Sequence, residues 1–477
     1  MRLFDTDVQK LKYDVLREVA RHAYDDRLAD SYLDIPKLLA PGPKSTMRCC
    51  IYKERAILAE RVKLALGGNA ENPNVVEVIG IACDECPVSG YQVGHDCRGC
   101  IAHRCMAACP RNAISLDENR HAHIDPALCI GCGKCAAACP YSAIANHRRP
   151  CENACKVDAI HMGEDRCATI NAARCTGCGA CVYQCPFGAI QDKSFLVQAI
   201  RLLRESKQQG YRAYAIVAPS ISSQFGYAKL GQVIAALKRL GFHSVVEAAL
   251  GADRVAWEEA RELSQKGFVT SSCCPAFVQY IRKAFPQLEP LISHNLSPMA
   301  EIARYLKQTD PTAKTVFIGP CTAKKQERAL PEVAPYVDCV LTFEELQAWI
   351  DSRDFDLTQL EEDVLDNASF FGRIFARSGG LSDAVAQALR EQGDSFALKP
   401  AVCDGIEACR TSLLKKSKGM LPENFIEGMA CVGGCIGGAG CLTHGAKNRS
   451  EVDRYGQQAL EKTIAEALTQ CSFPVKA

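Results

Sequence analysis

The sequence predicts a multidomain α+β protein with three parts: a helical N-terminal segment, a cysteine-rich middle region and a larger α/β domain. Three observations support this division. Apolar residues recur at helical spacing near the start of the chain, most of the 29 cysteines lie in the middle region, and strand-like and helical runs alternate after residue 193. We therefore place the parts at residues 1–80, 81–192 and 193–477.

Size and composition indicate a globular protein with substantial cores. The 477 residues exceed one ordinary domain, and 48% of them are hydrophobic. The 56 basic and 55 acidic residues nearly balance, so nothing predicts a nucleic-acid partner or an anionic membrane surface. Residues 1–40 lack the apolar core of a signal peptide, and no apolar run is long enough to span a membrane. We expect a cytoplasmic protein.

Helical periodicity dominates the first part. Val8, Leu11, Val15 and Val19 recur at the spacing of one helix face, and Tyr52 to Leu66 has a similar pattern. The polar stretch at residues 69–74 then interrupts this pattern.

The cysteines of the middle region favour metal clusters over disulfides. Disulfide frameworks suit small secreted domains, whereas this chain is large and shows no export signal. A segment of the form Cys-x3-Cys occurs four times, each followed four residues later by Ala-Ile, and begins at Cys105, Cys135, Cys151 and Cys181. Four copies predict two tandem units of the bacterial ferredoxin type.

Two copies complete the motif C-x2-C-x2-C-x3-C-P, which is typical of [4Fe–4S] ligation. In two-cluster ferredoxins the fourth cysteine of each motif binds the other cluster. This rule predicts three clusters, held by Cys97, Cys100, Cys105 and Cys139; by Cys129, Cys132, Cys135 and Cys109; and by Cys175, Cys178, Cys181 and Cys155.

A fourth cluster is left open by the sequence. Cys151 and Cys185 should serve one, but their repeat lacks a leading C-x2-C pair. Cys83 and Cys86 could complete the set, and Cys167 is another candidate. The competing interpretation is a zinc site that uses Cys83 and Cys86.

The third part reads as alternating strands and helices, which predicts parallel strands with ligands at their carboxyl ends. Strands are expected at Tyr214–Ala218, Ser244–Ala249, Gly267–Ser271 and Thr315–Gly319, and helices at Leu230–Leu240, Trp257–Gln265 and Tyr455–Thr469.

Three cysteine segments in this part begin where a predicted strand ends. They contain Cys273 and Cys274 before a proline, Cys321 after a proline, and Cys431 and Cys435 among glycines. Distant loops that each supply a thiolate can build one buried metal site, and glycines permit the backbone to approach it closely. Lys324 follows Cys321 by three residues and could donate hydrogen bonds to anionic ligands there.

In this order the segments resemble the three signatures of [FeFe] hydrogenases, which read T-S-C-C-P, P-C-x-x-K-x-x-E and M-A-C-x-x-x-C-x-x-G-G. The resemblance extends over residues 210–440. It implies reversible reduction of protons to H2 at an H-cluster, a [4Fe–4S] cubane joined to a diiron unit with CO, cyanide and dithiolate ligands. It also implies a ferredoxin-like electron carrier as partner, and maturation proteins that build the cofactor.

Site roles follow from the same resemblance. Lys324 would bind a cyanide ligand, Met429 would pack beside the diiron unit, and Cys273 would relay protons. The H-cluster would be held by Cys274, Cys321, Cys431 and Cys435, below the strand end Ala218, Pro219 and Ser220. The proton path would continue through Glu259, Ser293 and Glu262, although charge patterns allow both glutamates to lie on a solvated helix face. Cys273 could alternatively be a small buried thiol.

Several positions depart from the usual signatures, namely Phe277, Met299, Gly319 and Ala439. They resemble the divergent monomeric branch called group B, so a monomer is expected. Two other functions stay open: a non-enzymatic hydrogenase-like iron–sulfur protein and an H2 sensor. Outside the signatures we expect core or structural roles for Cys339, Cys403, Cys409 and His444, whereas Cys49, Cys50 and Cys441 have no predicted role.

Overall fold

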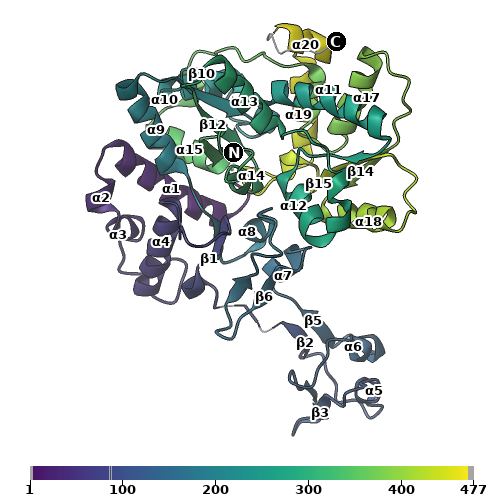
Figure 1. Cartoon of the computed structure of the whole chain (residues 1–477). Coiled ribbons are helices and arrows are strands. Elements are labelled where there is room, and N and C mark those ends of the chain that lie inside the picture. Colours follow the sequence, from purple (N-terminus) through teal and green to yellow (C-terminus); the bar gives the residue numbers. More distant parts are fainter. Residues whose placement is uncertain (1–3, 85, 88, 471–477) are drawn as a thin grey trace.

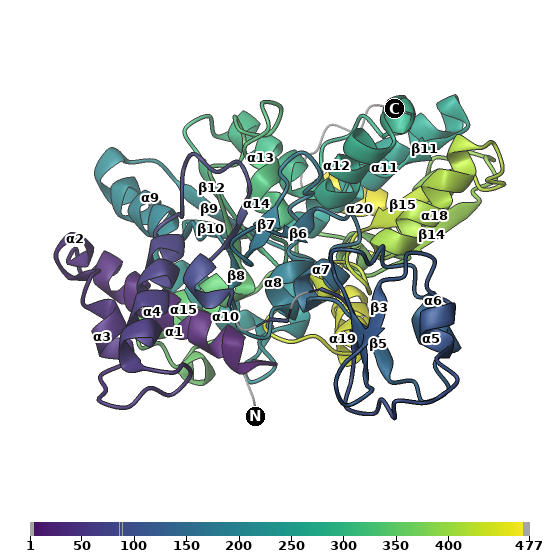
Figure 2. The same ribbon diagram turned by 90° about the horizontal axis from the view of Figure 1, so that it is seen from below.

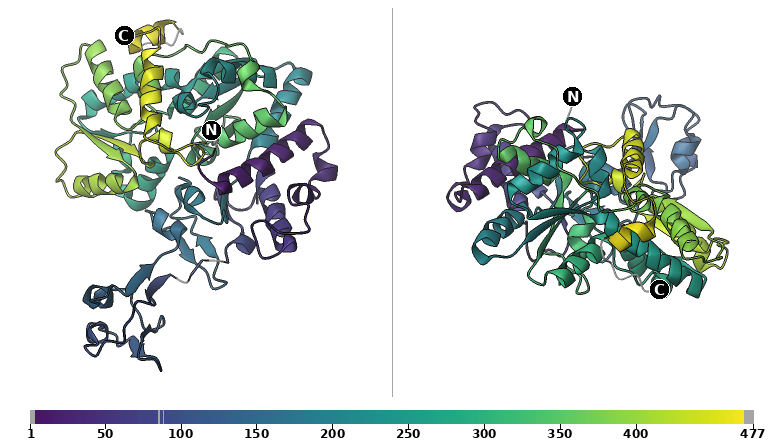
Figure 3. Two further views of the ribbon diagram at one scale, coloured as in Figure 1. Left: turned by 180° about the vertical axis from the view of Figure 1, so that it is seen from behind. Right: turned by 90° about the horizontal axis from the view of Figure 1, so that it is seen from above.

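The computed structural model describes residues 4–84, 86–87 and 89–470. It contains N-terminal helices, two small cysteine-rich units and a large α/β domain (Figure 1). The N-terminal helices lie against one side of the α/β domain, and one cysteine-rich unit projects away from it. The view from behind shows the same projection (Figure 3).

The N-terminal helices form where the apolar periodicity predicts them. Helix α1 (Asp7–Tyr24) begins with a capping box in which Thr6 and Gln9 satisfy each other's backbone amides. Its apolar face, including Val15 and Val19, is fully buried. The other helices are α2 (Leu28–Ser31), α3 (Ile35–Leu39) and α4 (Ile51–Ala65), and α1 packs against α4 and against α15 (Phe343–Ser352) of the α/β domain.

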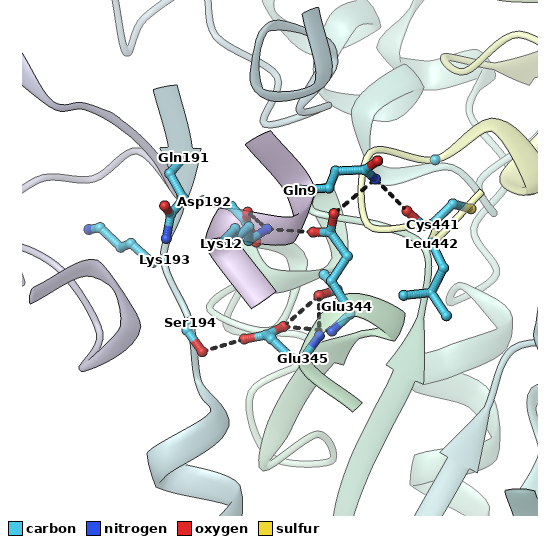
Figure 4. A network of polar contacts seen from close by, with 12 residues as sticks. Gln9, Lys12, Gln191, Asp192, Lys193, Ser194, Glu344, Glu345, Cys441 and Leu442 are labelled. Carbon is cyan, nitrogen blue, oxygen red and sulfur yellow. Dashed lines mark hydrogen bonds and ion pairs between the residues drawn. The ribbon is translucent and has the colours of Figure 1, made fainter. Parts of the chain in front are cut away.

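A buried charged network fastens α1 to the rest of the molecule (Figure 4). Lys12 bridges Asp192 and Glu344, with its Nζ 2.6 Å from Glu344 Oε2. Lys325 Nζ lies 2.8 Å from both Asp192 Oδ2 and Glu345 Oε2. These side chains are almost fully shielded from solvent, so each charge depends on its partners. The network joins the first helix, the end of the cysteine-rich region and the α/β domain.

The projecting part is the first cysteine-rich unit, here called unit one. Its strands pair antiparallel, β2 (Gly90–Val93) with β5 (Ile144–His147) and β3 (Ile114–Leu116) with β4 (Ala122–Ile124). Short helices α5 (Arg104–Ala107) and α6 (Lys134–Ala138) carry its middle cysteines. Its small core is made largely of those cysteines and a few isoleucines, as expected of a fold that depends on its clusters.

The second unit, unit two, lies between unit one and the α/β domain (Figures 1 and 2). It contains α7 (Pro150–Ala154), the strand pair β6 (Ile160–Met162) and β7 (Ala168–Ile170), and α8 (Ala180–Gln184). Its closing strand β8 (Ile190–Asp192) pairs antiparallel with β1 (Val76–Val78). Because β1 precedes unit one in the chain, unit one is inserted within unit two. Because β1 pairs with β8, residues 76–78 are part of unit two, although the sequence placed them in the helical segment at residues 1–80.

The α/β domain is built on two parallel sheets. The four-stranded sheet has the order β10 (Ser244–Glu247), β9 (Ala213–Val217), β12 (Lys314–Gly319), β13 (Cys339–Thr342). The three-stranded sheet has the order β11 (Val269–Thr270), β15 (Phe425–Met429), β14 (Pro400–Asp404). The four predicted strands are present with small shifts at their ends.

Helices cover both sheets and bury a continuous core. The predicted helix at residues 230–240 is α10 (Leu230–Leu240), and the one at residues 257–265 lies inside α11 (Ala248–Lys266). The remaining elements are α9 (Leu196–Gln209), η2 (Pro219–Ser223), α12 (Pro275–Ala284), α13 (Pro298–Thr309), α14 (Ala323–Glu327), α16 (Phe370–Ile374), α17 (Gly380–Glu391), α18 (Ile406–Ser417) and η5 (Cys435–Gly437), with short 3-10 turns at Gly80–Ala82, Pro286–Leu291 and Leu357–Gln359.

The predicted terminal helix at residues 455–469 is wrong, because the structure divides it. Helix α19 (Lys447–Gln457) ends before this stretch is complete, and α20 (Ile464–Gln470) begins after a turn. Glu391 accepts hydrogen bonds from the amides of Ile464 and Ala465, so a carboxylate of α17 caps the new helix. Tertiary capping has therefore overridden the continuous helical pattern.

Candidate metal centre

The three cysteine segments of the α/β domain follow the carboxyl ends of three parallel strands. Cys273 and Cys274 follow β11, and Cys431 follows β15, its neighbour in the same sheet. Cys321 follows β12 of the other sheet. The site therefore lies where the ends of two sheets meet, which agrees with the expected ligand position for α/β folds.

The second and third segments pack against each other through glycines. The amide of Gly440 donates to Pro320 O at 2.8 Å. A Cβ atom at Gly438 would lie 2.5 Å from that same carbonyl oxygen, so any larger residue would push the two loops apart. The glycine run thus keeps Cys435 close to Cys321.

The four predicted cluster ligands of this domain are electrostatic neighbours. Burial raises the pKa of Cys321 to about 12; Lys324 opposes the rise, and the Cys274 and Cys435 thiols add to it. Burial also raises the pKa of Cys431 well above its usual value, with contributions from the other three sulfurs. The raised pKa values of Cys321 and Cys431 favour their thiol forms, and a bound cation would favour the thiolates. The structure thus brings together Cys274, Cys321, Cys431 and Cys435.

The donor set fits an iron–sulfur cluster better than a single ion. Among the residues the structure describes, no group of three or more His, Cys, Asp or Glu side chains has the spacing of a single-ion site. The thiolates that bind a four-iron cluster lie further apart than those that bind one ion. All four candidate donors here are cysteine sulfurs, which are the usual ligands of such a cluster. The buried Ser220 Oγ also lacks a hydrogen-bond partner within the described part of the chain. It lies in η2, which packs against η5, the turn that begins at Cys435.

The remaining residues predicted above the cofactor lie in the same neighbourhood. Ala218 and Pro219 lead from β9 into η2, and both they and Ser220 are buried. Met429, at the end of β15, is 2% exposed.

Lys324 is buried beside the cysteines and keeps its charge. Its Nζ lies 3.2 Å from Glu327 Oε2 and 3.2 Å from Ser297 Oγ. It also lies over the Phe317 ring, 5.5 Å from the centroid. Burial opposes its charge, but Glu327 and the nearby thiols outweigh burial and raise the pKa of Lys324. The site thus contains a cation held for an anionic ligand.

Cys273 is buried and is adjacent to a buried carboxyl group. Burial raises its pKa well above the usual value, and Glu259 is the next contributor. Glu259 is fully buried in α11; its Oε1 accepts from the Ser272 amide at 3.2 Å, and its Oε2 has no partner among the described residues. The solvated-face interpretation of Glu259 is therefore wrong, because α11 turns this residue into the core.

A second carboxylate, that of Glu262, lies between Glu259 and the surface. Burial raises the pKa of Glu259 to about 8, while the Ser272 amide and the Ser293 hydroxyl act in the opposite direction. The Ser293 Oγ donates to Glu262 Oε2 at 2.9 Å, so Ser293 lies within reach of both carboxyl groups. Glu262 also pairs with Lys266 at 2.6 Å. Ser272 and Ser293 line a cavity of about 390 Å³ near this path.

The cysteines of the two units fall into sets that agree with the pairing rule. Burial is the largest cause that raises the pKa of Cys105, and the neighbouring sulfurs that raise it further belong to Cys100 and Cys139. For Cys135 they are Cys129 and Cys109, and for Cys178 they are Cys175 and Cys155. In each case the distant fourth cysteine of the partner motif lies within the set.

The fourth set consists of Cys83, Cys86, Cys151 and Cys185. Burial raises the pKa of Cys151 to about 12, and Cys185 and Cys83 contribute. Burial also raises the pKa of Cys86, with Cys185 and Cys83 among its neighbours. The C-x2-C pair after β1 thus occupies the place in unit two that Cys97 and Cys100 occupy after β2 in unit one. Cys167 adjoins Cys83 but bonds to Gly80 O, outside the set.

Contacts between sets define an order. Cys151 of the fourth set is among the neighbours of Cys181 in the third, and Cys178 of the third is a neighbour of Cys431. The Thr322 hydroxyl donates to Gly177 O at 2.8 Å and joins the third set to the loop that carries Cys321. The fourth set therefore adjoins the third, and the third adjoins the site in the α/β domain.

Sequence reasoning missed three polar residues of these sites. Ser272 binds Glu259, and Ser297 both caps α13 and bonds Lys324. Arg149 lies against Cys83, as described below. Ser272 is part of the first signature, and its position beside Cys273 was the available signal; the other two contacts are between distant segments.

Residues predicted to have core or structural roles have them. Cys339, Cys403 and Cys409 are buried in hydrophobic clusters. His444 Nδ1 lies 2.9 Å from Asp5 Oδ2, and its Nε2 lies 2.9 Å from Gly438 O, so both ring nitrogens have partners in the fold.

A four-sulfur site at the ends of parallel strands, preceded by two ferredoxin-like units, defines an iron–sulfur protein. Comparison with known families agrees with this class. Residues 211–439 match the family described as iron only hydrogenase large subunit, C-terminal domain, so this part of the chain is [FeFe] hydrogenase-like. Residues 96–143 match a 4Fe-4S dicluster domain and residues 168–191 a 4Fe-4S binding domain.

Curated relatives share the hydrogenase description at moderate identity. The chain is similar to iron hydrogenase 1 of Clostridium pasteurianum, at 28% identity over 48% of this chain and 48% of that protein. It therefore matches about half the length of that relative. It is also similar to the periplasmic [Fe] hydrogenase large subunit of Nitratidesulfovibrio vulgaris, at 29% identity over 68% of this chain and 87% of that protein.

A different kind of relative matches a shorter region. The cytosolic Fe-S cluster assembly factor NAR1 of Kluyveromyces lactis is 37% identical over 19% of this chain and 19% of that protein. Among solved structures, an [FeFe]-hydrogenase from Chlamydomonas reinhardtii aligns with a TM-score of 0.47 at 20% identity, over 58% of this chain and 92% of that one. Within the described residues, no helix is long and apolar enough to cross a membrane.

Proposed function

We propose that the protein is an [FeFe] hydrogenase that catalyses 2H+ + 2e− ⇌ H2. Cys274, Cys321, Cys431 and Cys435 would hold an H-cluster. When bound, this cofactor supplies the metal and the bridging amine at which H2 is formed or split. The observation that carries the proposal is the convergence of these four sulfurs beside a buried thiol and a buried ammonium, Cys273 and Lys324.

The residues around the cofactor have separate tasks in this proposal. The Lys324 ammonium, held by Glu327 and Ser297, donates to an anionic ligand and fixes its orientation. Met429 and the segment from Ala218 to Ser220 exclude water from the opposite side.

Cys273 exchanges protons with the cofactor and with Glu259. Because the pKa of Glu259 is raised to about 8, its carboxyl group can both hold and release a proton near neutral pH. Ser293 then connects Glu259 to Glu262, which reaches the surface beside Lys266.

Electrons take a separate route through four accessory [4Fe–4S] clusters. A ferredoxin-like carrier delivers them to unit one, which projects into solvent. Clusters held by the fourth and third sets would lie next to each other, and the third would lie next to the α/β domain, where Cys178 adjoins Cys431. The sharing of one neighbourhood by Cys83, Cys86, Cys151 and Cys185 supports four clusters over three clusters and a zinc site.

A second function has support from one comparison. Similarity to a cluster assembly factor over part of the chain is compatible with a non-catalytic iron–sulfur role. A buried Cys273 beside Glu259 favours catalysis, because a purely structural cluster needs no proton path. An H2 sensor would keep the same cofactor and differ in its rate of turnover.

One experiment separates these functions. The protein is purified anaerobically after maturation, and its infrared spectrum and H2 evolution from reduced methyl viologen are recorded. A hydrogenase shows CO and cyanide bands together with rapid turnover. Bands with slow turnover indicate a sensor, and the absence of bands from a protein with full iron content overturns the proposal in favour of the non-catalytic role.

A further inference from the structure

Two arginines are buried beside the fourth cysteine set without an acidic partner. Arg61 is 1% exposed and Arg149 is 2% exposed. Among the described residues, neither has a carboxylate within ion-pair distance. Burying a guanidinium group without a counter-charge costs several kcal/mol, so such residues are rare unless an anion is present nearby. Their position therefore calls for a negative group that the amino acids around them do not supply.

Arg149 is held against the C-x2-C end of the set. Its Nη2 donates to Arg166 O at 2.6 Å and its Nε to Pro87 O at 3.4 Å. Its Nη1 lies 4.0 Å from Cys83 Sγ. Two carbonyl oxygens thus fix the orientation of the guanidinium, and the Cys83 sulfur is the hydrogen-bond partner of its third nitrogen.

Arg61 lies near Cys185, whereas Arg149 lies near Cys83. It extends from α4 to the turn after Cys185, where its Nη2 donates to Gly188 O at 2.7 Å. Its Nη1 donates to Gln191 Oε1 at 2.9 Å, and its Nε has no partner within the described residues. Burial lowers the pKa of Arg61 to about 10, and the Cys185 sulfur opposes that shift. The group is nevertheless a cation at neutral pH.

Other charges near the set do not cancel these two. Glu152 is the acidic side chain that adjoins Cys151 and Cys86, and it accepts a hydrogen bond from Ser89. Arg48 adjoins Arg61 but is paired with Asp84 at 3.8 Å. Among the described side chains, two buried cations against one partly exposed carboxylate leave a net positive environment around the sulfurs.

We propose that Arg61 and Arg149 are the counter-charges of a [4Fe–4S] cluster held by Cys83, Cys86, Cys151 and Cys185, and that they raise its reduction potential. A cluster with four thiolates is anionic and becomes more so when it accepts an electron. Burial disfavours that extra charge, whereas two fixed guanidinium groups stabilise it. Arg61 and Arg149 act as positioning residues that let a buried cluster accept electrons from the exposed clusters of unit one.

This inference depends on the proposed presence of the fourth cluster, but not on hydrogen production. The test uses the purified holoprotein and an EPR-monitored redox titration of each cluster signal. Arg61→Gln and Arg149→Gln should each shift the signal of this cluster to a more negative potential and leave the others in place. Arg61→Lys and Arg149→Lys keep the charge and should stay near the wild-type potential. Arg111→Gln, an exposed arginine beside Cys109, is the matched control and should change little.

Each outcome decides between the alternatives. An unchanged potential in both glutamine variants with full iron content overturns the proposal. If the glutamine variants lose the cluster and the lysine variants keep it, charge is still the requirement; loss in both series means that guanidinium geometry matters and the proposal is wrong. Cys151→Ser should remove one EPR signal, and if all signals persist the fourth cluster itself is absent.

Discussion

Lys325 Nζ lies 2.8 Å from Asp192 Oδ2, and this contact ties the last strand of unit two to the helix that follows Cys321. The neighbouring Lys324 on the same helix is the residue proposed to bind the cofactor. The position of the electron-transfer region relative to the site therefore depends on a buried ion pair, and not only on apolar packing. The predictions below begin with this pair.

Removing the Lys325 charge should destabilise the protein strongly. Lys325→Met leaves Asp192 and Glu345 buried with fewer counter-charges, so we expect a loss of about 3–5 kcal/mol. Urea unfolding of the holoprotein measures this loss as a shift in the transition midpoint. Lys10→Met, which breaks only an exposed pair with Asp14, should cost about 0.5 kcal/mol or less. Equal midpoints for the two variants would contradict the role of the network.

The two adjacent cysteines should give opposite phenotypes. Cys274→Ala should reduce the iron content of the matured protein, because it removes a cluster ligand. Cys273→Ala should retain the iron and the infrared bands and lose H2 evolution by about 10²-fold or more, the usual scale for a missing proton-transfer group. Iron analysis and activity are measured on the same samples. Iron loss in Cys273→Ala would make that residue a ligand.

Glu259→Gln should block the proton path without disturbing the fold. The glutamine can still accept from the Ser272 amide, yet it cannot exchange a proton, so H2 evolution should fall by about 10²–10⁴-fold. The control is Glu258→Gln, the adjacent residue of α11, whose side chain is more exposed and pairs with Arg254. Similar activity in both variants would exclude Glu259 from the path.

The same substitution should change how stability depends on pH. The pKa of Glu259 is raised to about 8 in the folded protein, from 4.5 in the absence of the fold. Between these values the folded state keeps a proton that the unfolded state has released, so stability falls as pH rises from about 5 to 8. Glu259→Gln lacks this decline. Urea midpoints measured across this range should converge at the acid end, and parallel profiles would be inconsistent with a raised pKa.

Gly428 should tolerate no side chain. A Cβ atom there would overlap the Phe277 ring, and Gly428 lies one residue before Met429 in β15. Gly428→Ala should cost about 1–3 kcal/mol or prevent assembly of the site. Phe277→Leu combined with Gly428→Ala should recover part of the loss, and a double-mutant cycle of unfolding midpoints measures the coupling. Additive losses would mean that the contact is not limiting.

Local sequence patterns predicted much of the fold. The helical spacing at residues 52–66 predicts α4 to within one residue, and the apolar run at residues 315–319 predicts β12. Both elements form because their own apolar side chains become buried, so their local pattern is sufficient to predict them. The division of the terminal helix could not be predicted in this way, because Glu391, far away in sequence, caps α20.

The candidate site was predictable in composition and less so in arrangement. Motif spacing predicts the cysteines, and their grouping in the fold agrees with it. The completion of the fourth set required the pairing of β1 with β8, a contact between segments on either side of unit one. The buried arginines were hidden for the same reason: α4 is helical in pattern, and nothing in its periodicity shows that Arg61 turns toward Cys185.

The insertion of unit one within unit two has a consequence for biosynthesis. Unit one contains all of its strands in one uninterrupted stretch and can close as soon as that stretch leaves the ribosome. Unit two must wait, since β1 is made early and β8 is made last, and the loop between their ends is long. Metal loading would therefore begin at the outer end of the electron route and finish next to the catalytic domain.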